Sequence, residues 1–410
     1  MAFGDTPYDE PLRAAWKQFC KRLEDAGDKA FKDYNPATPL HRADAFRYLT
    51  QNLGQTFDLA LETKNTRYPA LFTFSNPYCK LAGDAADFVY VQAWIDGQSV
   101  YKISGNRGTA RFINFTVQGP RPEKQPGTEI PSLHEPFGDI PEANLFGHQL
   151  QSNWDGSFEL YIGGEQRGPN WLPTTPGSRK LFLRQGFDGW DEQPARMRIE
   201  RLGMTEPRPM PTPEDFIEAM DWAGNFVTGL MNDWPDHSIQ YSKPVVDYDH
   251  PNVFPAGPKD DQADAKRGRA VAHMVWQLEP DQALIIEFDR DDAFWMLSNN
   301  GAFMSSMDFL YRPVSYTPAR TKVDPDGKIR LILAHDDPGY HNWIDTSGFV
   351  RGNLTFRYLL GAMAPPIATR VVKRSELAAA LPGDTARVTP DERTAQLQAR
   401  FHGILQRYSL

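Results

Sequence analysis

The seventeen residues from His335 to Arg351 hold the densest group of side chains able to do chemistry. They include two histidines, three aspartates, one tryptophan and one arginine. The runs on either side alternate as strands do, so this stretch is predicted to be a loop between two strands. Because loops on a rigid scaffold carry much of protein chemistry, we expect a polar pocket here, floored by Trp343.

In the functional interpretation, Asp337 and Asp345 act as a general acid/base pair, and His341 is a third catalytic candidate. Arg351 orients an anionic or hydroxyl-rich substrate. The expected activity is that of a cytoplasmic hydrolase or lyase acting on a hydroxyl-rich small molecule or oligosaccharide. For a glycosidase, a carboxylate separation of about 5 Å predicts retention and one of about 6.5–9.5 Å predicts inversion. The side chains expected to bind the substrate are Trp343, Asn342, Arg351, Tyr340, Trp171 and Asn170.

The same loop also has a structural interpretation. The sequence Asp337-Pro-Gly is then a turn, Asn342 caps the loop backbone and Trp343 fills the end of a β-sandwich. A metal interpretation uses His335, Asp337 and His341 as ligands. Nothing in the sequence enforces a third ligand, so we expect no metal and no cofactor.

The Asn342-Trp343 pair has a counterpart, Asn170-Trp171, 172 residues earlier in the chain. Each pair follows an Asp-Gly turn and a strand, and the turn repeats with an offset of 171. Such regular spacing indicates an internal duplication. A feature present in both copies is more simply structural, whereas residues that differ between copies are free to have specialised. The differing residues are Asp345, His341 and Asp337, opposite Pro173, Pro169 and a residue near Glu165.

A second pair of similar blocks, residues 87–106 and 281–300, aligns without gaps at an offset of 194. The first copy is then longer by 22 residues, which we place in 118–147. That segment is rich in proline, glycine and charge and is predicted to be a long surface loop. Asp96-Gly97 lies between two strand-like runs and predicts a hairpin. The acidic turn at 289–292 occupies the matching place and is expected to be a hairpin rather than a calcium site.

Helix-like stretches precede both β-rich regions. Residues 10–33 and 43–62 have helical character, and Thr212-Pro-Glu-Asp begins a further helix with an N-cap threonine and acids in the first turn. A stiff, proline-rich linker at 205–213 separates the halves. The expected domains are a helical segment at 1–66, a β-sandwich at 67–204, a linker and helix at 205–236, a second β-sandwich at 237–373 and a helical tail at 374–410.

The chain ends in a predicted helix that opens with Thr389-Pro-Asp-Glu. Its large apolar side chains recur with helical periodicity. They are Leu397, Phe401, Ile404, Leu405 and Tyr408. Such a face must pack on the body of the protein or on another subunit, and we expect a homo-oligomer.

Composition limits the classes of partner and location. The net charge of −9 argues against nucleic acid and anionic membranes, because no basic patch compensates for it. Aromatic residues make up 12% of the chain, which suits β-sandwich cores and also grooves that stack on sugars or flat apolar ligands. Cys20 and Cys79 lack the spacing of a metal site. With no signal-like start and no apolar run of membrane-spanning length, a cytoplasmic location is expected.

The two Asn-Trp blocks, with Asp337-Pro-Gly before Trp343 and a strand ending in Arg357 after it, resemble a bacterial family described as domain of unknown function 1214. The resemblance covers the ends of both halves and implies tandem jelly-roll-like β-domains. It implies an architecture and no mechanism. The expected fold is therefore mainly β with flanking helices: two duplicated helix-plus-β-sandwich (jelly-roll-like) repeats and a C-terminal helix.

Two other functions remain open at this point. One is an enzyme or binding protein for an apolar cyclic compound such as a terpenoid or steroid, suggested by the aromatic content. The other is a non-catalytic oligomeric scaffold. The lining of the pocket discriminates between the first two hypotheses, because several carboxylates favour a sugar-like ligand and walls of Met, Phe and Leu favour a lipid-like one.

Overall fold

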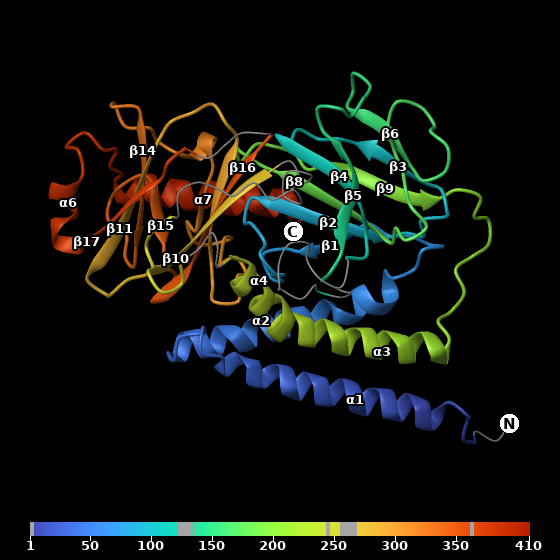
Figure 1. Ribbon diagram of the computed structural model, residues 1–410. Helices are drawn as coiled ribbons and strands as arrows, with labels where there is room; N and C mark the ends of the chain where they lie inside the picture. Colours follow the sequence, from blue (N-terminus) through green and yellow to red (C-terminus); the bar gives the residue numbers. More distant parts are fainter. Residues whose placement is uncertain (1–3, 122–132, 134–136, 243–246, 255–268, 361–364) are drawn as a thin grey trace.

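The computed structural model describes residues 4–121, 133, 137–242, 247–254, 269–360 and 365–410. The chain forms two β-sandwiches side by side, with a layer of helices beneath the first and a long helix at the C-terminal end (Figure 1). The predicted fold class is confirmed, since four sheets form two similar halves with flanking helices. In the part of the chain that the structure describes, no helix is long and apolar enough to cross a membrane.

The helical layer consists of α1 (Asp9–Asp28), α2 (Pro39–Phe57), α3 (Pro213–Thr228) and α4 (Trp234–Ser242). Short π-helical turns, Asp58–Glu62 and Gly229–Asp233, extend α2 and α3. The side chain of Thr212 accepts a hydrogen bond from Asp215 and the Asp215 carboxylate accepts one from Thr212, so α3 begins with a capping box. The apolar faces of α1, α2 and α3 share one core with the sheet above them (Figure 1).

The first β-sandwich is built from nine strands. They are β1 (Phe72–Ser75), β2 (Phe88–Trp94), β3 (Tyr101–Asn106), β4 (Phe112–Gly119), β5 (Ile140–Phe146), β6 (Ser157–Ile162), β7 (Trp171–Leu172), β8 (Lys180–Gly186) and β9 (Arg196–Arg201). A sheet in the order β1-β2-β8-β4-β5 faces a sheet in the order β7-β6-β3-β9. Strand β2 is buried on both sides, with Val89 and Val91 in the sandwich core and Phe88 and Tyr90 against the helices.

The second β-sandwich has eight strands. They are β10 (Arg269–Gln277), β11 (Gln282–Asp289), β12 (Trp295–Asn300), β13 (Ser315–Tyr316), β14 (Lys328–Ala334), β15 (Trp343–Asp345), β16 (Arg351–Leu359) and β17 (Ala368–Lys373). Its sheets have the orders β10-β16-β12-β13 and β15-β14-β11-β17. Aromatic side chains fill the space between them, with Trp295 stacked on Phe356 at a centroid distance of 5.2 Å. Large rings in a closed core leave little room for a ligand inside the sandwich.

The two sandwiches repeat one topology, because β2 to β9 occupy the same places in their sheets as β10 to β17. Arg184 of β8 corresponds to Arg357 of β16, because these two strands hold the same place in their sheets. Tyr90 pairs with Arg184 and Val271 pairs with Arg357. Val271 is therefore the counterpart of Tyr90, 181 positions later. The expected offset of 194 is therefore wrong, since it placed β2 opposite β11. All strands share the same alternation of apolar and polar residues. Two pairs of strands can therefore be aligned without gaps in more than one register.

The predicted hairpins at Asp96-Gly97 and 289–292 are also wrong. Each turn joins strands of two facing sheets, β2 to β3 and β11 to β12, rather than neighbours in one sheet. At Gly97 a Cβ atom would lie 1.9 Å from the Thr175 carbonyl oxygen, so the glycine allows a close approach of two backbones. The predicted loop at 118–147 contains β5, while its residues 122–132 and 134–136 lie outside the described chain.

The last helix, α7 (Pro390–Tyr408), packs on the body of the protein, which is one of the two arrangements expected for its apolar face. Ile404 is buried in the core of the second sandwich. The helix also buries three arginines spaced seven residues apart, Arg393, Arg400 and Arg407. Arg407 donates to Asp87 of the first sandwich at 3.0 Å, and Arg393 donates to Asp337 of the second at 2.9 Å. Helix α7 therefore ties the two sandwiches together.

Candidate functional site

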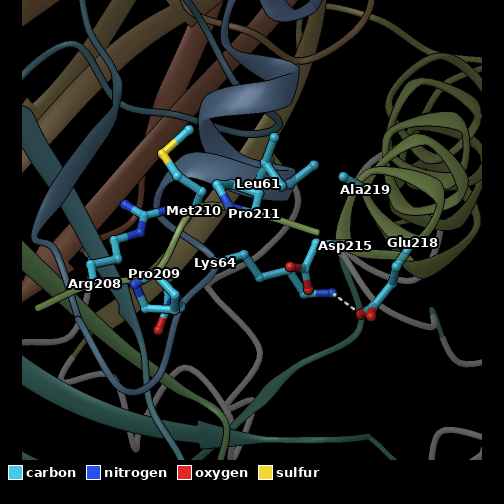
Figure 2. Close-up of a pocket in the computed structure, with 11 residues that line it drawn as sticks. Leu61, Lys64, Arg208, Pro209, Met210, Pro211, Asp215, Glu218 and Ala219 are labelled. Carbon is cyan, nitrogen blue, oxygen red and sulfur yellow. Dashed lines mark ion pairs between the residues drawn. The ribbon is translucent and has the colours of Figure 1, made fainter. Parts of the chain in front are cut away.

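A solvent-open pocket of about 130 Å³ lies between the end of α2, the proline-rich linker and the first turns of α3 (Figure 2). We call it the linker pocket. Its polar lining comes from three separate parts of the chain. The polar residues are Lys64, Asn65, Arg208, Asp215 and Glu218. Two carboxylates, two cations and one amide therefore converge on a space of small-molecule size.

The linker is held against the body by contacts from the segment that precedes β1. The Tyr68 hydroxyl donates to the Pro207 carbonyl at 2.9 Å, and Arg67 pairs with Glu206 at 3.1 Å. Prolines stiffen the linker itself, so one wall of the pocket is fixed by the backbone.

Helix α3 supplies the carboxylates on one side of the pocket (Figure 2). Asp215 and Glu218 are three residues apart and therefore lie on the same helix face. The Asp215 carboxylate accepts a hydrogen bond from the Thr212 amide at 2.7 Å, which fixes its position. Glu218 is 77% exposed at its side chain and has no such backbone bond among the hydrogen bonds described. Both residues are exposed, and Glu218 is the one whose carboxylate is not already held by a backbone amide.

Lys64 faces Glu218 across the pocket, with 3.5 Å between Nζ and Oε1 (Figure 2). The same ammonium lies 5.6 Å from the ring centroid of Trp94 and 5.5 Å from that of Trp222. Both indole rings are buried and meet edge to face at 6.0 Å. The rings hold the ammonium by cation–π attraction and leave its polar side toward the pocket.

A second, much smaller cavity of about 20 Å³ is lined by Tyr34, Tyr248, Arg351 and Asn353, with Ile239 among its apolar walls. We call it the Arg351 pocket. It lies where α4 and the loop before α2 meet the start of β16. Arg351 was predicted from the sequence to bind substrate, and it does line a cavity. The acidic residues predicted with it, Asp337 and Asp345, do not line this cavity.

The acidic residue Asp345 lies in β15, and its carboxylate is buried. One oxygen accepts from Arg312 at 2.7 Å and the other accepts from the Ser347 amide at 2.7 Å. Its backbone carbonyl accepts from the Asn299 side chain at 3.0 Å. These contacts hold strands of the second sandwich together, and catalysis by Asp345 stays a prediction.

The other predicted catalytic residues face helix α7. Asp337 accepts from the Gly339 amide at 2.8 Å and from Arg393 at 2.9 Å. His341 contacts the Asn342 amide oxygen through Nδ1 at 2.9 Å, and burial lowers the pKa of its imidazole. The Tyr340 hydroxyl accepts from Arg387 at 2.8 Å. Among the described residues, no three His, Cys, Asp or Glu side chains lie close enough to hold a metal ion.

The two Asn-Trp pairs make the same hydrogen bonds in both sandwiches. Asn342 accepts from the Lys322 amide and donates to the carbonyls of Lys322 and Arg330, at 2.8–3.0 Å. Asn170 makes the corresponding bonds to Gln151 and Glu159 at 2.7–2.9 Å.

The paired tryptophans repeat in the same way. Trp343 donates to the Ala334 carbonyl at 3.1 Å, and Trp171 donates to the Gly163 carbonyl at 3.2 Å. Each asparagine side chain supplies hydrogen-bond partners to backbone groups at a strand end that would otherwise have none. The geometry therefore supports the structural interpretation of Asn170, Trp171, Asn342 and Trp343.

The linker pocket was not predicted from the sequence. Its charged residues are spread over 155 positions, from Lys64 to Glu218, and no local motif joins them. The sequence feature that could have indicated this pocket is the stiff, proline-rich linker, which has charged residues on both sides and ends at the N-cap of a helix.

Residues 91–185 match the model of a family described as protein of unknown function (DUF1214). The match includes Asn170, Trp171 and Arg184, so the resemblance expected from these residues is confirmed. The chain is similar to an uncharacterized protein from Burkholderia cenocepacia, with 28% identity and a TM-score of 0.77 over 90% of this chain and 99% of that one. A protein from Vibrio parahaemolyticus has 12% identity and a TM-score of 0.42, over 86% and 100% of the two chains. No curated protein sequence matches this chain significantly.

Proposed function

We propose that the protein binds a small, hydroxyl-rich molecule in the linker pocket and acts on it as a hydrolase or lyase by acid/base chemistry. The observation that carries the proposal is the polar lining, in which Glu218 and Lys64 face each other at 3.5 Å above two buried indole rings. Hydroxyl groups of a ligand both donate and accept, so they match a pocket that offers carboxylates and cations together.

Glu218 is the proposed acid/base residue, because it is accessible and faces the open space. Lys64 would orient a hydroxyl group and stabilise negative charge that develops on it. Asp215 is proposed to bind rather than react, since its carboxylate already accepts from the Thr212 amide. Arg208 would close the other side of the pocket and contact a ligand hydroxyl.

The lining favours this ligand class over an apolar cyclic compound. Large apolar side chains contribute only part of the wall, namely Leu61 and Met210. A terpenoid or steroid would bury several polar groups of the pocket without partners, which costs free energy for each of them. A cytoplasmic location, a small-molecule partner and a homo-oligomeric state remain part of the proposal.

The proposal is tested by screening monosaccharides, polyols, sterols and terpenoids for thermal stabilisation of the purified protein. A hydroxyl-rich ligand is expected to raise the Tm of the wild type. The shift should be lost in Glu218→Gln and in Lys64→Met. Glu214→Gln is the matched control, because Glu214 lies one turn earlier on α3 and outside the pocket.

Stabilisation by sterols or terpenoids alone would contradict the proposal. So would a polyol shift that survives both pocket substitutions. Once a ligand is found, turnover of that ligand by wild type and Glu218→Gln separates binding from catalysis. A loss of rate with the dissociation constant unchanged would support acid/base chemistry by Glu218.

A further inference from the structure

The Arg351 pocket differs from the linker pocket in charge, since no Asp or Glu side chain lines it. Its polar lining consists of Arg351, Tyr34, Tyr248 and Asn353. Arg351 donates to the Tyr248 backbone carbonyl at 3.3 Å, and within the described part of the chain it forms no ion pair with a carboxylate. A half-buried guanidinium without a countercharge, at the wall of a cavity, is a site for an anion.

The two tyrosines add neutral donors beside the guanidinium. Burial raises the pKa of Tyr248 to about 12. Burial also raises the pKa of Tyr34, whose hydroxyl in addition interacts with the Asp236 carboxylate. Both phenols therefore keep their protons at neutral pH and remain able to donate. Arg351 and the two tyrosines line the same small cavity, and a guanidinium with neutral donors beside it suits the planar oxygens of a carboxylate.

The pocket also contains a buried acceptor. Asn353 is 6% exposed, and its Nδ2 donates to the Gly301 carbonyl at 3.3 Å. Its Oδ1 atom is buried and has no hydrogen-bond partner. Buried acceptors are rarely left unpaired in native proteins, so this oxygen points to a ligand that brings an N–H or O–H group.

We propose that the Arg351 pocket binds the carboxylate end of a small α-hydroxy acid. The carboxylate accepts from Arg351 and Tyr248, and the α-hydroxyl donates to the Oδ1 of Asn353. The cavity of about 20 Å³ admits only such a compact group, and the rest of a larger acid would extend into solvent through the open side. This site is separate from the linker pocket, whose two cations already face two carboxylates of the protein.

The test uses the full-length protein and radiolabelled glycolate in equilibrium dialysis. The wild type is expected to bind glycolate with a Kd on the order of 1 mM, as suits so few ligand atoms. Acetate, which lacks the hydroxyl, should bind several-fold more weakly, and glycolamide, which lacks the charge, should not compete.

Substitutions assign each contact. Arg351→Met should weaken glycolate binding at least tenfold. Asn353→Ala should lower glycolate affinity to that of acetate while leaving acetate unchanged. Arg290→Met is the arginine control, since Arg290 is exposed and distant from the lining, and Glu218→Gln controls for the linker pocket. Both controls should bind glycolate as the wild type does.

Far-UV circular dichroism and Tm measurements check that each variant is folded. If Arg351→Met does not fold, Arg351→Lys and Tyr248→Phe carry the test, and both are expected to weaken glycolate binding several-fold. No glycolate binding by the wild type, equal binding by the folded arginine and tyrosine variants, or loss of binding in Glu218→Gln would overturn the proposal. Loss of polyol binding alone leaves this site intact and refutes only the function proposed for the linker pocket.

Discussion

The two sandwiches share one asparagine–tryptophan arrangement but differ in the acids that surround it. Asn170 and Asn342 make the same three backbone hydrogen bonds, whereas Asp337 and Asp345 occur only in the second copy. Both acids are bound by arginines, Asp337 by Arg393 of helix α7 and Asp345 by Arg312. The second copy is the one that receives the start of α7. Residues that differ between the two copies can therefore serve to bind helix α7 as readily as to catalyse a reaction.

The two ends of α7 are anchored in different environments. At its C-terminal end, Arg407 and Asp87 are both buried, and Arg320 pairs with the second oxygen of Asp87 at 2.5 Å. At its N-terminal end, the Asp337 side chain is 35% exposed. The arginine is buried at both ends, but only at the N-terminal end does water reach the pair, through the partly exposed Asp337 carboxylate. Loss of the acid is therefore expected to cost less stability there.

The largest expected effect is therefore that of Asp87→Asn, which leaves Arg320 and Arg407 buried without a countercharge. We expect it to lower the free energy of unfolding by about 4 kcal/mol. Asp337→Asn, at the exposed end, should cost about 1 kcal/mol. Urea denaturation measures both, and equal costs at the two ends would refute the difference between the anchors.

The next largest loss of stability is expected from substituting the asparagine that both sandwiches share. Asn170→Ala and Asn342→Ala each remove three hydrogen bonds and leave backbone groups of a buried strand end unpaired. Each should destabilise the protein by about 3 kcal/mol. Unfolding curves of the two variants should shift by similar amounts. A cost below about 1 kcal/mol at either position would contradict a structural role for that copy.

The charge of Asp87 also sets a pH dependence. Burial alone would raise its pKa, but Arg320 and Arg407 outweigh burial and lower the pKa to about 2. The folded value thus lies below the usual 3.8, so this stabilisation is complete above pH 3.8 and is lost as the pH falls toward 2. The loss should be about 2 kcal/mol, and it should be absent in Asp87→Asn. Denaturation series between pH 5 and 2 on both proteins measure it.

The smallest expected effect is that of Asp345→Asn. The amide keeps the hydrogen bond from the Ser347 amide and loses the ion pair with Arg312, whose side chain is 48% exposed. The cost in stability should be about 1 kcal/mol. Loss of several kcal/mol would show that the pair acts as a buried one, contrary to the exposure of the arginine.

The sequence was sufficient for the duplication, the fold class and two of the helix starts, because these follow from local patterns, whereas α2 begins at Pro39, before the predicted residue 43. The capping threonines Thr212 and Thr389 begin helices as expected. The turn at Asp96-Gly97 has the residues of a hairpin, yet the chain passes there from one sheet to the other. Which strand pairs with which is decided by contacts distant in sequence, and a two-residue turn carries no information about them.

The positions of the predicted site residues relative to one another depend in the same way on contacts distant in sequence. The density of acids between His335 and Arg351 marked a true cluster, but the fold separates it, with Asp337 facing α7, Asp345 facing Arg312 and Arg351 lining another cavity. The face predicted for α7 from its apolar side chains does not include the three arginines that the helix buries. Their spacing of seven was the signal that they share the buried face.

The most direct test of the account compares three proteins against the same set of polyols and monosaccharides in a thermal-shift assay. They are the wild type, Glu218→Gln and Asp345→Asn. A stabilising ligand is expected to shift the Tm of the wild type and of Asp345→Asn and to leave that of Glu218→Gln unchanged. A shift that survives in Glu218→Gln and disappears in folded Asp345→Asn would contradict it and place the site in the acidic loop.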